Sequence, residues 1–386
     1  MNNRLVSRRI VAAASGLVLA AVLFDSAQQG PPLAGKKAEE AYKNILVLKG
    51  APAEQVVPAM RVIAGSLGVG CNFCHVAGDF AKDDMDSKRT ARSMITMMMD
   101  INKNNFNGEQ RVTCFTCHNG SNNPAATLQF ADMATAPQEG GRGGGRGQGP
   151  AADQILANYV QALGGEPAIR KIATLTITAT RDAPAAGGAA AEAGPPAGGP
   201  PQAQVEEYFK APNLMVTIVH APNGMTTENG FDGTTGWAQN ARGAVADLTG
   251  TDQSRAKRAA NIYEPVELSK EYGNLMTRGT AKVGDHTAYV VIGTPQGDQQ
   301  ERLFFDTTTG LLVRKIVIDP TPVGNSPVQT DYDDYRDVGG VKMPFMIRVT
   351  APPNNRITTH VQKVDTSAPI DSSKFAKPPS KAAQAQ

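Results

Sequence analysis

The 386-residue chain lacks a strong charge of either sign, and it lacks a long apolar run anywhere after residue 24. Its net charge is +2 with 19% charged residues, so there is no strong field to attract nucleic acid or an anionic membrane surface. It has only four cysteines and five histidines, and no G-x-S-x-G or H-E-x-x-H sequence surrounds a histidine. The motif-bearing hydrolases and metalloproteases are therefore not indicated.

The first residues have the pattern of a secretory signal. Arg4, Arg8 and Arg9 precede an apolar run at 10–24, and roughly 17 residues would be needed to span a bilayer. We expect residues 1–27 to form a signal peptide, which places the protein in the periplasm or on the extracellular side of the membrane. An uncleaved signal anchor, and hence membrane association, is the alternative, because Asp25 lies close before the expected cut.

All four cysteines fall in two C-x-x-C-H units. The units are Cys71-Asn72-Phe73-Cys74-His75 and Cys114-Phe115-Thr116-Cys117-His118. Two thiols at this spacing can form thioethers to the two vinyl groups of a haem, and the adjacent histidine is then the proximal ligand of the iron. The sequence thus predicts two covalently bound haem c groups.

Three other uses of the cysteines fit less well. A zinc ribbon places its C-x-x-C pairs roughly 15–20 residues apart, whereas 39 residues separate Cys74 from Cys114 here. Disulfides within each unit would close very small loops and stabilise little. A thioredoxin-like pair requires a strand followed by a helix, which neither unit shows.

Methionines near each unit are candidates for the sixth iron ligand, and a methionine ligand favours electron transfer. Met60 shares a helical face with Ile63, Ala64 and Leu67, and Gly68 ends that helix before the first unit.

The run TARSMITMMMDIN at 90–102 holds four more methionines in a second helix. Helical phase centres Met94 and Met98 on its apolar face and leaves Met97 and Met99 on the flanks. Core packing is the alternative role for each of them, and phase does not choose between Met94 and Met98.

The order of these segments resembles the photosynthetic reaction centre cytochrome c subunit family over about residues 42–121. The residues that carry the resemblance are CNFCH, an acidic loop, TARSM and VTCFTCHNG. That family is tetrahaem, and this chain matches one adjacent pair of units. The resemblance implies that Met94 ligates the second iron and that Met60 ligates the first.

The composition changes after the haem units, which are expected to form a domain at 28–133. Residues 134–152 are Gly-rich and indicate a flexible linker, and residues 183–204 indicate a disordered loop inside the next domain. From 153 to 380 the pattern is mainly β, with helices expected at 153–165 and 252–263. Eight strands are expected at 174–180, 204–210, 214–220, 286–293, 301–306, 311–318, 343–350 and 356–364.

The predicted fold class is α+β with two domains, a small α-helical dihaem domain and a curved antiparallel half-barrel with one or two helices. The second domain is similar, more weakly, to the outer-membrane lipoprotein-sorting protein family, through FDGTTGW, LFFDTTTGLLVRK and YRDVGGVKMPFMIRV. That resemblance implies an open barrel that shelters an acyl chain.

The main functional prediction is an exported dihaem cytochrome that passes single electrons between partner proteins or quinol. Its β domain would dock a partner or hold an apolar ligand, and its two neighbouring haems would act as a relay. One alternative is an enzyme, a dihaem peroxidase or a quinol-oxidising protein with an open iron position. Another is a lipid or lipoprotein carrier with accessory haems.

Overall fold

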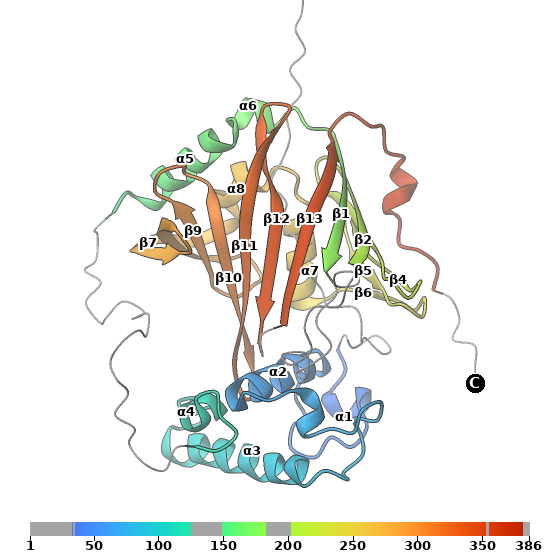
Figure 1. Ribbon diagram of the computed structural model, residues 1–386, viewed down its shortest axis with the longest axis vertical. Coiled ribbons are helices and arrows are strands. Elements are labelled where there is room, and N and C mark those ends of the chain that lie inside the picture. Colours follow the sequence, from blue (N-terminus) through green and yellow to red (C-terminus); the bar gives the residue numbers. More distant parts are fainter. Residues whose placement is uncertain (1–32, 34, 125–148, 183–201, 353–354, 381–386) are drawn as a thin grey trace, which may run out of the picture.

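The computed structural model describes residues 33, 35–124, 149–182, 202–352 and 355–380, and it shows a helical N-terminal part beneath a large β-sheet (Figure 1). The predicted signal peptide and most of the predicted linker and loop lie outside these residues. Within the described ranges, no helix is both long and apolar enough to cross a membrane.

The N-terminal part consists of short helices joined by turns. They are α1 (Ala38–Ala41), η2 (Ala53–Gln55), α2 (Val56–Leu67), η3 (Cys71–Phe73), α3 (Asp86–Asn105) and α4 (Cys114–His118). The predicted end of α2 is confirmed, since Gly68 adopts a left-handed φ of 66°. A Cβ at Gly68 would lie 2.1 Å from the Gly120 carbonyl oxygen, so glycine also permits the close packing of α2 against the second haem unit.

One antiparallel sheet of 13 strands makes up the C-terminal part. Its strands are β1 (Thr174–Asp182), β2 (Gln202–Lys210), β3 (Leu214–His220), β4 (Thr226–Asp232), β5 (Gly236–Gln239), β6 (Val245–Asp247), β7 (Tyr272–Val283), β8 (His286–Pro295), β9 (Glu301–Asp306), β10 (Leu312–Thr321), β11 (Gly324–Val338), β12 (Val341–Ala351) and β13 (Asn355–Asp365). The order β6-β5-β4-β3-β2-β1-β13-β12-β11-β10-β9-β8-β7 places the first and last strands side by side. The predicted antiparallel fold class is confirmed.

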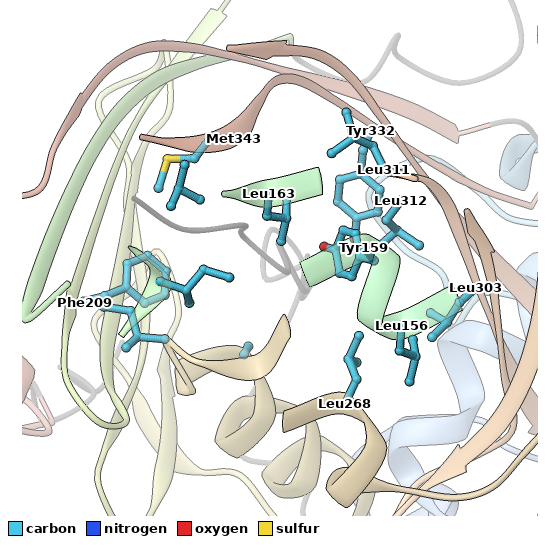
Figure 2. Packing of buried hydrophobic residues seen from close by; sticks show 14 of the residues in the cluster. Leu156, Tyr159, Leu163, Phe209, Leu268, Leu303, Leu311, Leu312, Tyr332 and Met343 are labelled. Atoms are coloured by element: carbon cyan, nitrogen blue, oxygen red, sulfur yellow. The ribbon is translucent and has the colours of Figure 1, made fainter. Parts of the chain in front are cut away.

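Helices cover one face of the sheet and form the core with it. They are α5 (Ala152–Leu163), α6 (Glu166–Ile169), α7 (Gly250–Ala260) and α8 (Glu264–Glu271). The short helix η4 (Ser372–Phe375) lies outside this core, and its Phe375 packs in a separate cluster with Val216 of β3 and Trp237 of β5. Figure 2 shows Tyr159 and Leu163 of α5 among buried side chains of the sheet such as Leu312 and Met343. The sequence predicted one or two helices here; α6 and α8 are additional, and both are short.

Two predicted boundaries differ from the structure. The predicted linker reaches residue 152, but the Pro150 carbonyl accepts a hydrogen bond from Thr277 Oγ1 at 2.8 Å and α5 begins at Ala152. The predicted disordered loop reaches residue 204, but β2 begins at Gln202 because its backbone pairs with Asp182 of β1. A side-chain hydrogen bond and a helix start therefore define the first boundary, and strand pairing defines the second.

All eight predicted strand segments are strands, but five further strands were not predicted: β4, β5, β6, β7 and β11. The segments β4 and β11 are rich in polar residues, and β7, at one edge of the sheet, contains two glycines. Sequence patterns miss such strands because their pairing partners, and not their own apolar alternation, hold them in place.

The tip of the β10–β11 hairpin joins the sheet to the helical part. Val323 is completely buried in a cluster that includes Val62 of α2 and Met98 of α3. Gln110 Nε2 donates a hydrogen bond to the Thr321 carbonyl at 3.1 Å. In Figure 1 the hairpin reaches down to α2, so a β-domain residue completes the core of the helical part.

Candidate haem sites

The first C-x-x-C-H unit forms a single helical turn after α2. Cys71 is exposed and Cys74 is half-buried, and backbone hydrogen bonds from Cys74 and His75 to the Cys71 carbonyl hold the turn. Ser87 Oγ donates to the Phe73 carbonyl and ties the turn to α3. Burial raises the pKa of the Cys74 thiol, although a hydrogen bond with Ser87 partly offsets this effect. The two thiols are therefore exposed or half-buried on a turn that hydrogen bonds hold in place.

His75 is oriented by a backbone carbonyl. Its Nδ1 lies 3.0 Å from the Phe80 carbonyl oxygen, and the two rings meet edge to face with centroids 5.2 Å apart. A carbonyl only accepts hydrogen bonds, so Nδ1 carries the proton and Nε2 keeps a free lone pair. Burial lowers the pKa of His75, which favours the neutral, metal-binding form of the ring.

The second unit repeats this arrangement in α4. Thr116 Oγ1 accepts a hydrogen bond from the Thr113 backbone amide at 3.0 Å at the start of the helix. His118 Nδ1 lies 2.9 Å from the Ser121 carbonyl oxygen. Both histidines therefore present a free Nε2, and in both the orienting carbonyl belongs to the loop that follows the motif.

Asn102 fastens the segment before the second unit to α3. It is buried, and its Oδ1 accepts hydrogen bonds from the backbone amides of Arg111 at 3.0 Å and Val112 at 2.8 Å. Its Nδ2 donates to the Val112 carbonyl at 2.7 Å and contacts Met98 Sδ at 3.2 Å. Since Cys114 follows directly, this amide sets the position of the second pair of thiols.

One of the two methionines that helical phase centres on the apolar face of α3 is not buried in the structure. Met98 is buried as expected, but Met94 is 45% exposed and Met97 is 49% exposed. The buried side chains of α3 are instead Lys88, Ile95, Met98 and Asn102. The two polar ones, Lys88 and Asn102, can be buried because backbone carbonyls accept hydrogen bonds from them. The Met98 sulfur is already in contact with Asn102, whereas the Met94 side chain is accessible.

Met60 lies half-buried on α2 and packs against the cluster that contains Val62, Met98 and Val323. Cys114 of the second unit packs against the same cluster. The structure thus gives Met60 a packing role in this arrangement of side chains, and its assignment as a ligand of the first iron rests on the resemblance alone.

The exposed apolar side chains of the N-terminal part suit a bound porphyrin. Among the described residues, large hydrophobic side chains with substantial exposure are concentrated between residues 46 and 115. They are Leu46, Val57, Phe73, Phe80, Met94, Met97, Phe106 and Phe115. With paired thiols and an oriented histidine in each unit, the donor set fits haem c.

A shared metal site is not formed by the two units. In the part of the chain that the structure describes, no group of three or more Cys, His, Asp or Glu side chains is arranged to hold a metal ion. All four thiols are free.

Asp83 and His286 each have a partner within the protein. Asp83 forms ion pairs with Lys88 at 3.0 Å and Arg92 at 2.8 Å, which hold the pKa of its carboxyl well below the usual range. His286 pairs with Asp306 at 2.9 Å, not with Asp285. The buried Lys88 and Asn102 were missed by the sequence analysis, because nothing in a sequence distinguishes a buried polar residue from a solvated one.

Solved structures similar to the chain have low sequence identity. A LolA superfamily protein from Nitrosomonas europaea has a TM-score of 0.41 at 12% identity, covering 59% of this chain and 99% of that one. A putative outer membrane lipoprotein-sorting protein domain from Vibrio parahaemolyticus has a TM-score of 0.41 at 10% identity, covering 58% and 97%.

Sequence relatives match a short part of the chain. The photosynthetic reaction center cytochrome c subunit of Thermochromatium tepidum is 36% identical over 91 residues, 22% of each chain. Cytochrome c-554 of Chloroflexus aurantiacus is 37% identical over 87 residues, 21% of each. The match spans about a fifth of the length of these curated relatives. Residues 13–158 match the family model of the photosynthetic reaction centre cytochrome C subunit, and the N-terminal part of this chain is therefore similar to that family, as its haem-unit sequences predicted.

Proposed function

We propose that this protein is an exported dihaem c-type cytochrome that transfers single electrons. Haem, when bound, supplies an iron that changes its charge by one electron. The first pair of thiols and His75 hold one haem, and the second pair and His118 hold the other. The attaching cysteines are Cys71, Cys74, Cys114 and Cys117.

The observation that carries the proposal is the repeated histidine geometry. In each unit the motif histidine directs Nδ1 to a backbone carbonyl, Phe80 for His75 and Ser121 for His118. This hydrogen bond fixes the ring and leaves Nε2 as the ligand atom, which is the usual arrangement of a metal-binding histidine. Two histidines placed alike after two C-x-x-C sequences support two haem sites.

Met94 is the proposed sixth ligand of the second iron, and Met60 that of the first. The accessible side chain of Met94 supports the first of these assignments, since Met98 is buried against Asn102. A thioether ligand stabilises the reduced iron and favours electron transfer over binding of small molecules.

The proposed location is the periplasm or the extracellular side of the membrane, where covalent attachment retains the cofactor. The basic and apolar N-terminal sequence supports export. The proposed partners are redox proteins or quinol. The β domain would dock such a partner or hold an apolar group, and its contact with the helical part through Val323 supports a joint role.

The test is to express the full chain together with a cytochrome c maturation system. We expect two covalently bound haems per chain by pyridine haemochrome assay, and two low-spin His/Met irons by absorption and magnetic resonance spectra. Replacing both cysteines of one unit by alanine should leave one haem, and His220→Ala, in strand β3, is the control that should leave two. A high-spin, peroxide-reactive iron would favour the enzyme instead.

The carrier alternative has its own measurement. Organic extraction of the purified full chain, followed by mass spectrometry, would detect a copurified lipid. Stoichiometric lipid together with slow or absent electron exchange would favour a lipid carrier with accessory haems.

A further inference from the structure

The Phe80 carbonyl oxygen accepts two hydrogen bonds from two different side chains. His75 Nδ1 lies 3.0 Å from it and Lys88 Nζ lies 2.9 Å from it. The oxygen that orients the first histidine is therefore also bonded to an ammonium group, and one atom separates the lysine charge from the imidazole proton.

Lys88 is built into this position. Only 8% of the residue is exposed, and Nζ also donates to the carbonyls of Ala81 at 3.1 Å and Lys82 at 2.6 Å. Lysine is seldom buried unless its charge is paired, and here Asp83 is the ionic partner at 3.0 Å. The ammonium group thus organises the whole loop that follows the first motif.

Lys88 shares its ionic partner with a second cation. Asp83 carries the single negative charge among the contacting groups, and it is shared between Lys88 and Arg92, whose NH1 lies 2.8 Å from Asp83 Oδ2. Asn44 donates a further, neutral hydrogen bond to Asp83 at 2.9 Å. The Asp83 carboxylate is therefore divided between two cations and does not pair with Lys88 alone.

The carbonyl that orients His118 in the second unit differs from the Phe80 carbonyl. His118 Nδ1 bonds to the Ser121 carbonyl, and within the described ranges no lysine or arginine side chain is hydrogen-bonded to that oxygen. The two histidines therefore have the same tautomer but carbonyl partners of different electrostatic character.

From this difference we infer that Lys88 is a positioning residue that raises the reduction potential of the first haem relative to its value without the charge. The inference rests on the proposed dihaem function. An ammonium group on the Phe80 carbonyl weakens that oxygen as an acceptor for His75, which makes the ring a poorer electron donor to a bound iron. The positive charge of the Lys88 ammonium, close to His75 through the shared carbonyl, also favours the ferrous state, whose charge is lower. Both effects act in the same direction.

The experiment is a spectroelectrochemical titration of the full-length, haem-loaded protein and of Lys88→Gln. Gln keeps a hydrogen-bond donor and removes the charge. One of the two midpoint potentials should fall, with its reduction equilibrium changed on the order of ten-fold, which is about 59 mV for a one-electron couple. The other midpoint potential should equal its wild-type value. In Lys88→Arg, which keeps the charge, both midpoint potentials should be close to those of the wild type.

Two further variants keep the result interpretable. Lys103→Gln, an exposed lysine on the same helix, is the matched control and should leave both potentials unchanged. Asp83→Asn should move the affected potential upward, since it removes the negative charge that opposes Lys88 and Arg92. This second variant tests the inference independently if Lys88→Gln does not mature.

Unchanged potentials in Lys88→Gln, or an equal shift of both, would overturn the inference while leaving the cytochrome proposal intact. Failure of the chain to bind two haems in the pyridine haemochrome assay would instead contradict the proposed function itself. Assigning the affected potential to the first haem uses Cys114→Ala with Cys117→Ala, which removes the second attachment site, and the same Lys88→Gln shift is expected there.

Discussion

Asn102 and Val112 are joined by a reciprocal pair of hydrogen bonds, in which Asn102 Nδ2 donates to the Val112 carbonyl at 2.7 Å and the Val112 amide donates to Asn102 Oδ1 at 2.8 Å. One buried side chain thus replaces the backbone partner that Val112 would have in a strand. The segment before the second C-x-x-C-H unit is thus hydrogen-bonded to α3 through this side chain, in addition to the packing of Val112 and Cys114 against Ile95 and Met98.

Asn102→Ala should lower the free energy of unfolding by roughly 1–3 kcal/mol, because it leaves the half-buried amide and carbonyl of Val112 without their partner. Haem attachment at the second unit should fall with it. Chemical unfolding and haem content measure the two effects. The control is Asn105→Ala, an exposed residue that donates only to its own helix at Ile101, and an equal loss in the control would contradict the role of Asn102.

Met94→Ala and Met98→Ala should have opposite signatures. Met94→Ala should remove the Met-to-iron charge-transfer band of the second haem with little loss of stability, since its side chain is 45% exposed. Met98→Ala should keep the band and cost roughly 2–5 kcal/mol through the cavity it leaves. Absorption spectra and denaturant unfolding separate them. Loss of the band in Met98→Ala alone would overturn the assignment of Met94.

Val323→Asp should separate the helical part from the sheet. Val323 is fully buried among residues of α2 and α3, and an unpaired charge there should cost roughly 3–5 kcal/mol. We expect the helical part to unfold at lower temperature in scanning calorimetry. Asn325→Asp, exposed on the same hairpin, is the matched substitution, and equal melting curves for the two variants would show that the contact does not matter.

Glu207 makes stability depend on pH in the β domain. It is buried on the same face of β2 as Val205 and Phe209, and one of its carboxylate oxygens lacks a hydrogen-bond partner among the described residues. Burial raises its pKa from 4.5 to about 7, although Arg181 partly opposes the shift. Between pH 4.5 and 7 the folded state binds more protons than the unfolded state, so stability falls as pH rises through this window.

Glu207→Gln should remove this dependence and stabilise the protein at pH 8 by roughly 1–3 kcal/mol. Urea unfolding at pH 5 and pH 8 measures the difference. The control is Glu206→Gln, on the opposite and partly exposed face of the same strand, which should keep the wild-type slope. If stability fell more steeply between pH 5 and pH 8 in Glu207→Gln than in the wild type, the raised pKa of Glu207 could not be the cause of the pH dependence, and the prediction would be wrong.

Helical phase in α3 shows how far sequence patterns reach. The helix, its approximate length and the burial of Met98 follow from apolar spacing, and the structure confirms them. The helix begins at Asp86, before the run 90–102, and its buried face is rotated so that Met94 is 45% exposed. The cause is that Lys88 and Asn102 are polar and buried, and their partners are carbonyls of loops that no periodicity describes.

The two C-x-x-C-H units can be recognised from the amino-acid sequence alone, because the thioether chemistry proposed for them needs residues that are adjacent in the chain, from Cys71 to His75 and from Cys114 to His118. The sequence also determined the strands whose own apolar alternation matches a sheet. Only the tertiary structure decided that the Phe80 carbonyl serves both His75 and Lys88, and that Val323 completes a core more than two hundred residues away. Those contacts depend on loop paths and strand pairing, which arise when distant segments meet.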